Sequence, residues 1–223
     1  MLRIQMIGLA IMAALAMSAI AAGSASAAHE WLINGKPITT ATKVHSVGLL
    51  LLEDSKAPGG AVSVHCKGFD DGTVGPGALD LILAITTELL KGSDKIPCTF
   101  DKAGLCKSNV PPTALALNLP WHTAIVLVGT EVRDLLLADG NGEPGYNVIC
   151  QGPFGETQED ECLAEPSTMG STTLENVAGG VRGIFQGKAA ELTKCSKGGA
   201  GAGKVTGEVL TESPSATEKL TFQ

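Results

Sequence analysis

Apolar and polar residues alternate in short runs along most of the chain, which is typical of β-strands. Residues 44–53 (VHSVGLLLLE) begin with this alternation and become continuously apolar, as in a strand that is buried on both faces. After a turn sequence at residues 58–60 (PGG), residues 61–66 (AVSVHC) alternate again. The two apolar segments therefore predict a β-hairpin.

A second group of strands is expected between Leu119 and Cys162. This stretch contains three apolar segments, with breaks at residues 129–130 and 139–145, and an acidic segment at residues 156–165 follows the third one. We expect the other strands of the protein to pair with this stretch or to pack on it.

Shorter signals complete the pattern. Asn34-Gly35 lies between two β-favouring runs and predicts a hairpin, because both central residues of a type I′ turn need positive φ. Residues 68–77 (GFDDGTVGPG) are interpreted as a turn throughout. Residues 78–91 fit a helix by length and leucine content, but the run LILAITT and the β-rich surroundings favour a strand. Further short strands are expected within residues 174–188, 204–212 and 218–222.

Many short strands separated by Gly and Pro predict an all-β fold. The expected architecture is an antiparallel β-sandwich or an irregular barrel.

The N-terminal residues have the pattern of a signal peptide. Arg3 is followed by an apolar run at residues 7–22 and then by the small residues Ala25 and Ala27 at the processing positions. We expect residues 1–27 to form a signal helix that is removed on export, leaving residues 28–223 as a single secreted β domain. The mature chain has no other uncharged apolar stretch near the roughly 18–20 residues of a spanning helix, so no transmembrane segment is expected there.

Composition narrows the range of ligands. The formal net charge of -7 argues against nucleic acid, whose phosphates need clustered Lys and Arg. Aromatic residues make up only 4% of the chain, whereas stacking platforms for bases or sugars are built from aromatic rings. No motif indicates a cofactor.

The cysteines indicate the compartment. An even number of cysteines in an exported chain predicts disulfides. Proximity in sequence favours Cys98–Cys106 and Cys150–Cys162, which leaves Cys66–Cys195 as a long closure between the first and last strands. The six cysteines are Cys66, Cys98, Cys106, Cys150, Cys162 and Cys195.

Several sequence blocks together resemble a known group of proteins. The blocks are WLINGKPI, VSVHCKG followed by DGTVGPG, a local cysteine pair before LPWHT, GYNVIC, and a Gly-rich C-terminal strand pair. With a signal peptide, this combination resembles uncharacterised secreted six-cysteine, Gly-rich β proteins of soil actinobacteria. That group has no assigned activity, so the resemblance implies a secreted β fold and no functional residue.

One segment is similar to a phosphate-binding loop. Residues 198–206 (GGAGAGKVT) nearly match G-x-x-x-x-G-K-[ST], but Val205 stands where the magnesium-binding hydroxyl belongs. The loop also needs a helix that starts at Lys204, where a strand is expected. We therefore expect no ATP binding.

Two segments offer oxygen ligands for calcium. Asp139, Asn141 and Glu143 alternate like the start of a calcium loop, but Pro144 breaks the EF-hand pattern. A hairpin turn and a solvated acidic loop are the favoured interpretation of both segments. The acidic segment contributes Glu156, Glu159, Asp160, Glu161 and Glu165.

Copper is the other metal considered. Cleavage after Ala28 would make His29 the N-terminus, whose amine and imidazole could bind copper with His65 or His122, as in copper-dependent polysaccharide monooxygenases. The small residues Ala25 and Ala27 favour the earlier cleavage site, and ordinary surface histidines are the simpler interpretation.

The sequence favours a secreted or cell-surface β protein with a structural or binding role and an extracellular partner. A calcium- or copper-binding module remains an alternative. A secreted hydrolase or a copper monooxygenase-like enzyme is another, although G-x-S-x-G is absent. A catalytic cleft would require His122, Trp121 and Asp139 to meet.

Overall fold

Antiparallel β-strands make up the regular structure of this protein. The computed structural model describes residues 29–86, 95–137, 142–164, 171–185 and 193–223, and every regular element in these ranges is a strand. The strands are β1 (Trp31–Ile33), β2 (Lys36–Pro37), β3 (Thr42–Asp54), β4 (Val62–Val74), β5 (Leu79–Thr86), β6 (Lys95–Ala103), β7 (Thr113–Leu117), β8 (Trp121–Val128), β9 (Glu131–Leu137), β10 (Gly145–Gln151), β11 (Thr157–Ala164), β12 (Ser171–Val177), β13 (Gly180–Phe185), β14 (Thr193–Cys195), β15 (Gly199–Glu212) and β16 (Leu220–Phe222). The predicted all-β fold is confirmed, whereas the predicted signal helix lies outside the described residues.

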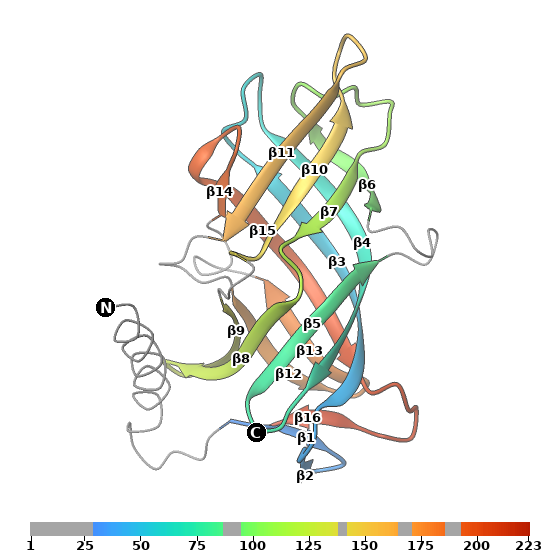
Figure 1. Cartoon of the computed structure of the whole chain (residues 1–223), viewed down its shortest axis with the longest axis vertical. Coiled ribbons are helices and arrows are strands. Elements are labelled where there is room, and N and C mark those ends of the chain that lie inside the picture. The colour runs from blue at the N-terminus through green and yellow to red at the C-terminus, as the bar shows by residue number, and fades with distance from the viewer. Residues whose placement is uncertain (1–28, 87–94, 138–141, 165–170, 186–192) are drawn as a thin grey trace, which may run out of the picture.

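The larger of two sheets closes on itself twice. Its strand order is β13-β12-β9-β8-β5-β4-β3-β15-β14-β11-β10-β7-β6, with additional pairings β13–β15 and β4–β6. The first closure gives a lower ring of β3, β4, β5, β8, β9, β12, β13 and β15, and the second gives an upper ring of β3, β4, β6, β7, β10, β11, β14 and β15. Figure 1 shows the two rings one above the other, with β3, β4 and β15 running through both. This closure fits the irregular-barrel form of the prediction.

Two of the three shared strands, β4 and β15, are long enough to change partners halfway along their length. Residues 62–66 of β4 pair with β6, whereas residues 69–74 pair with β5. Residues 199–203 of β15 pair with β14, whereas residues 207–211 pair with β13. We call the level of these changes the waist.

Each ring encloses its own hydrophobic core. The core of the upper ring includes Leu52, Val64, Ile96, Tyr146 and Val148. The core of the lower ring includes Trp31, Ile38, Val74, Ile125, Val181 and Leu220. Trp31 and Leu220 come from the small sheet β16-β1-β2, which therefore closes the lower end of the molecule.

Several local predictions are confirmed. β3 and β4 form the predicted hairpin, with Thr42 opposite Val74 and Asp54 opposite Val62. Asn34 and Gly35 connect β1 to β2 with positive φ values of 52° and 73°. Within residues 78–91, the described part forms strand β5, as expected.

Other local predictions are wrong, because strand alternation continues where turns or full burial were expected. Leu49 lies within the run expected to be buried on both faces of β3, yet its side chain is 56% exposed. Residues 68–74 belong to β4 rather than to a turn. The acidic segment lies mainly in strand β11 rather than in a loop.

All six cysteines form disulfides, but the expected pairing is wrong. The bonds are Cys66–Cys98, Cys106–Cys150 and Cys162–Cys195. Cys66 lies opposite Cys98 on β4 and β6, and Cys162 lies opposite Cys195 on β11 and β14. Strand register brings these residues together, and all three bonds join elements of the upper ring.

Register also excludes the short-range pair Cys150–Cys162. Cys150 faces Gln158 and Cys162 faces Tyr146, so the two cysteines lie four residues apart along the β10–β11 hairpin. At about 3.3 Å per residue this separation is roughly 13 Å. A disulfide requires Cα atoms within about 7 Å.

We predict that replacing Cys66 and Cys98 with Ala lowers the free energy of unfolding by about 2–5 kcal/mol, because the unfolded chain loses a cross-link. The sequence separations of Cys66–Cys98 and Cys162–Cys195 are 32 and 33 residues, so alanine at Cys162 and Cys195 should have a similar effect. Urea unfolding measures both. Non-reduced peptide mapping that joins Cys98 to Cys106 would contradict the pairing.

Candidate functional site

An apolar cavity lies at the waist, where the two rings meet. Its volume is about 140 Å³, and its lining includes Leu50, Ile85, Ile96, Tyr146 and Val205. These residues come from strands of both rings. We call this space the waist cavity.

An acidic cavity of about 110 Å³ adjoins it inside the lower ring. Asp70 of β4, Asp80 of β5 and Asp134 of β9 line its wall. Trp31 and Trp121 line the same space, and they are the only two tryptophans of the chain. We call this space the acidic cavity.

The two cavities share part of their walls. Asp70, Trp121 and Phe185 line both of them. These shared side chains form the boundary between the apolar cavity at the waist and the acidic cavity in the lower ring.

A depression lined by apolar residues adjoins the waist cavity. It has a volume of about 300 Å³ and is lined by residues of β5, β7 and the segment after β7. Ile85, Leu115 and Ala116 line both this depression and the waist cavity. Leu83, which also lines the depression, is 49% exposed. We call this depression the mouth.

The three aspartates have few hydrogen-bond donors. The Thr123 hydroxyl donates to Asp80 and also contacts Asp134, although a hydroxyl carries only one proton. Asp134 receives a backbone N–H from Ala124, yet its Oδ1 atom is buried without a partner. The carboxyl group of Asp70 accepts a hydrogen bond from the Ser46 side chain. Three ionised carboxylates cannot all be satisfied by these donors.

The pKa values of the three aspartates are raised as a result. Burial, opposed in part by Ser46 and His45, raises the pKa of Asp70 to about 6. Burial and the charge of Asp70 raise the pKa of Asp134 to about 7. Burial and then the charge of Asp134 raise the pKa of Asp80 well above its usual range.

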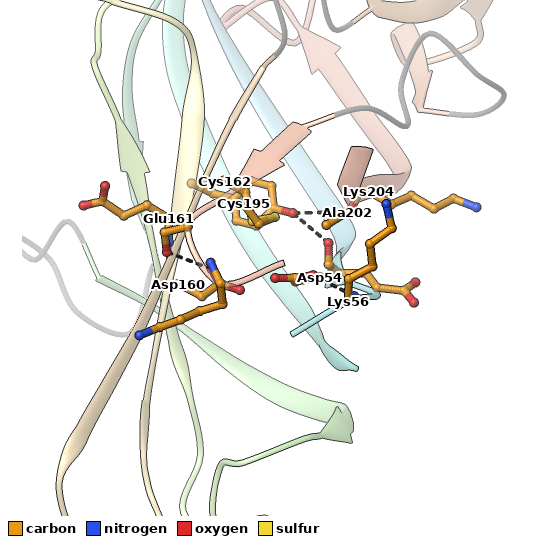
Figure 2. The surroundings of a disulfide bond; sticks show 12 residues. Asp54, Lys56, Asp160, Glu161, Cys162, Cys195, Ala202 and Lys204 are labelled. Carbon is orange, nitrogen blue, oxygen red and sulfur yellow. Dashed lines mark hydrogen bonds between the residues drawn. A yellow bond between two sulfur atoms is a disulfide. The ribbon is translucent and has the colours of Figure 1, made fainter. Parts of the chain in front are cut away.

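A second carboxyl pair lies beside the Cys162–Cys195 disulfide. Figure 2 shows Asp54 and Asp160 near this bond. Asp160 accepts hydrogen bonds from the Ser196 hydroxyl and the Lys197 N–H, both at 3.0 Å. Burial and the contact with Asp54 raise the pKa of Asp160 to about 6. Asp54 Oδ2 is buried without a hydrogen-bond partner.

This carboxyl pair has a structural role. Asp54 Oδ1 accepts the N–H of Lys56 at 2.8 Å, and a Cβ added to Gly198 would lie 2.1 Å from the same oxygen. The pair therefore joins the β3–β4 turn to the glycine-rich turn before β15. Asp160, Cys162 and Cys195 could geometrically surround an ion, but the sulfur atoms are bonded to each other.

The structure describes only part of the residue set proposed for calcium. Asp139, Asn141 and Glu165 lie outside the described residues. In β11, Asp160 points inward and is 8% exposed, whereas Glu159 and Glu161 point outward. Strand alternation therefore separates the acidic side chains.

The proposed copper ligands are not brought together among the described residues, and Asp139 of the proposed catalytic cleft lies outside them. His29 Nδ1 lies 2.8 Å from the Gln223 carbonyl oxygen. Among the described residues, the one group of three possible metal ligands contains no histidine. Trp121 lines the cavity while the adjacent His122 is exposed, since neighbouring strand residues face opposite sides.

The glycine-rich segment similar to a phosphate-binding loop is part of strand β15. No helix begins at Lys204, as the sequence predicted. Gly198, at the start of the segment, allows close packing, because a Cβ there would lie 2.1 Å from Asp54 Oδ1.

Sequence reasoning missed the acidic cavity. Asp80 and Asp134 stand among apolar residues in LDLILAIT and EVRDLLL, at positions whose alternation places them inside the ring. A carboxylate at an inward position of an apolar strand is a sequence signal for a buried polar site. Asp70 was hidden in the segment interpreted as a turn.

Searches of protein-family models, curated proteins and solved structures found no match to the chain. The three disulfides and the β-rich, Gly-containing fold fit the group of secreted proteins described above, but no family match identifies that group. No helix among the described residues is long and apolar enough to cross a membrane.

We predict that the free energy of unfolding falls by about 2–4 kcal/mol between pH 5 and pH 8. The folded protein binds protons more tightly than the unfolded chain at Asp70, Asp80, Asp134 and Asp160. Its stability is therefore greatest below their unfolded pKa and is lost as pH rises through about 6 to 7. Urea unfolding with intact disulfides measures this dependence.

Asp134→Asn should flatten this pH dependence. Glu161→Gln is the control, because the Glu161 side chain is exposed on β11 of the upper ring. A free energy of unfolding that rises between pH 5 and pH 8 would contradict the account of the acidic cavity.

Proposed function

We propose that this protein binds a small amphipathic molecule inside its two adjoining cavities and acts in an oxidising, extracellular environment. The continuous change of the interior from apolar to acidic is the observation that carries this proposal. Three disulfides support the environment, since such bonds persist in oxidising compartments. In this proposal residues 1–27 are the export signal and residues 28–223 are the mature domain.

The size of the waist cavity suits a small apolar group. Its volume of about 140 Å³ is comparable to an apolar cavity of about 150 Å³ that binds benzene. Closed eight-stranded sheets are either filled by side chains or hold one small ligand. Small residues such as Gly48, Gly68 and Ala114 form part of the wall of the waist cavity.

The aromatic residues also support a ligand site. The sequence contains two Trp, one Tyr and five Phe. Trp31, Trp121, Tyr146, Phe69 and Phe185 all line one of the two cavities. The low aromatic content argued against stacking ligands, but most of the aromatic rings lie around this interior space.

The disulfides of the upper ring support a preformed cavity. Cys66 lines the waist cavity and is bonded to Cys98 across β4 and β6. A cross-link at the wall limits how far the ring can open. A preformed cavity costs less ordering entropy on binding than a flexible one.

An acid–base enzyme is the second candidate, because raised carboxyl pKa values are characteristic of catalytic sites. A bound molecule that is recovered chemically changed after incubation would favour the enzyme. A bound molecule that is recovered intact favours a binding protein. Mass spectrometry of the extracted ligand distinguishes the two.

We predict that 6-bromo-1-hexanol quenches the tryptophan fluorescence of the protein with saturation. Both tryptophans line the acidic cavity, and a bromine atom quenches an indole that it contacts. Burial of six methylene groups at about 0.8 kcal/mol each corresponds to a dissociation constant on the order of 0.1–1 mM.

Ala116→Phe should weaken this binding at least about tenfold, a loss of about 1.4 kcal/mol, by filling the mouth. Ala216→Phe makes the same change at an exposed position of the β15–β16 connection and should leave binding unaltered. Quenching that is linear in concentration and equal in both variants would indicate collisions at the surface and would refute the proposed function.

A further inference from the structure

We propose that the acidic cavity binds the ammonium group of an organic cation whose apolar body occupies the waist cavity. This inference rests on the proposed function and adds the charge and chemical class of the ligand. The residues that would hold the ammonium group are Asp70, Asp80, Asp134, Trp31 and Trp121.

The charge of the cavity wall is the first argument. None of the described residues that line either cavity is Lys, Arg or His. The polar groups beside the aspartates are hydroxyls of Ser46, Thr73, Thr172 and Thr211, together with Thr123 behind Asp80. Hydroxyls cannot neutralise a carboxylate. A buried group of carboxylates without a cation is electrostatically unfavourable, and a bound ammonium group would supply the missing charge.

The orphan atoms of the cavity are the second argument. Asp134 Oδ1 is buried without a hydrogen-bond partner. Trp31 is only 2% exposed, and its indole N–H also has no partner. Buried polar atoms without partners are rare in proteins, and each one calls for an explanation. The two orphan atoms belong to residues that line the same cavity.

The aromatic rings are the third argument. An ammonium group is attracted to the face of a tryptophan ring, and aromatic rings are the usual recognition element for quaternary ammonium ligands. The Trp121 ring is held in place by a 2.7 Å hydrogen bond from its Nε1–H to the Leu117 carbonyl oxygen. Trp121 lines both cavities, so it can contact the head and the body of one ligand.

An organic cation fits this cavity better than a metal ion. Calcium requires six or more oxygen ligands around one point. The ligand atoms of Asp70, Asp80 and Asp134 do not form a group within 4.8 Å of one another, unlike those of Asp160, Cys162 and Cys195. The adjoining waist cavity is apolar, which suits the hydrocarbon part of an amphipathic cation.

The groups around the carboxylates determine how binding depends on pH. His45 Nδ1 and Asp71 Oδ1 lie within hydrogen-bond distance at 2.9 Å, and both residues affect the pKa of Asp70. The acidic groups that face one another inside are Asp70, Asp80 and Asp134, from β4, β5 and β9. A cation favours their ionised forms, so its affinity should rise between pH 5 and pH 8. A neutral ligand should show no such increase.

Three probes with one hydrocarbon body test the inference. They are (6-bromohexyl)trimethylammonium, 6-bromo-1-hexanol and 6-bromohexanoate, and tryptophan quenching reports the binding of each. At pH 8 we expect the cation to bind at least tenfold more tightly than the alcohol and the carboxylate to bind most weakly. Asp134→Asn and Asp80→Asn should each reduce the ratio of cation to alcohol affinity at least tenfold, whereas Glu161→Gln, at an exposed position of β11, should preserve it.

The outcomes separate the inference from the proposed function. Binding of the alcohol with no preference for the cation would overturn the inference and leave the proposed function intact. No saturable binding of any probe would overturn both. Displacement of the cation by an equimolar amount of calcium would indicate a metal site and would also overturn the inference. If a variant fails to fold, as judged by circular dichroism, the relative affinities of the three probes for the unaltered protein still test the preference for a cation.

Discussion

The pairing of β3 with β4 and β15 along its whole length is the constraint on which the rest of the structure depends. β3 is matched residue for residue to β4 from Thr42 to Asp54 and to β15 from His45 to Asp54. Because both neighbours extend past the waist, each can pair with a different strand in each half. Two rings can therefore close on one shared wall of three strands.

The shared wall also explains why the interior combines two chemistries. Alternate residues of a strand face the same side, so β3 directs Val44, Ser46, Leu50 and Leu52 to the cavities and cores of both rings. The upper half of this line is apolar and is supported by disulfides. The lower half lines the acidic cavity together with Asp70 and the hydroxyl groups beside it. A ligand that lies along β3 would therefore contact an apolar region at one end and a carboxylate at the other.

Local sequence signals predicted the elements that depend on a few neighbouring residues. The Asn34-Gly35 turn and the β3–β4 hairpin were predicted because turn chemistry and alternation act over short distances. The all-β class followed from the same signals. The expectation that residues 119–162 organise the fold was wrong, since β3, β4 and β15 hold that position and their long-range pairing has no local signature.

The disulfides and the acidic cavity could not be predicted for the same reason. Cys66 meets Cys98 because β4 and β6 pair in one register, and proximity in sequence carries no information about that register. Asp70, Asp80 and Asp134 come from β4, β5 and β9, which are brought together by strand pairing through β8. A charged residue at an inward position of an apolar strand can be recognised in sequence, but its neighbours across the cavity cannot.

The central claim is that the two rings enclose one ligand site that extends from the waist to the acidic cavity. Anomalous diffraction from crystals soaked with (6-bromohexyl)trimethylammonium tests it most directly, because the bromine atom marks the end of the hydrocarbon body. The account predicts a bromine peak in the waist cavity near Ile85 and Tyr146, with the ammonium group beside Asp134 and Trp121. Bromine peaks confined to the outer surface, for example near Leu49 or Phe154, with both cavities empty of ligand density, would contradict it.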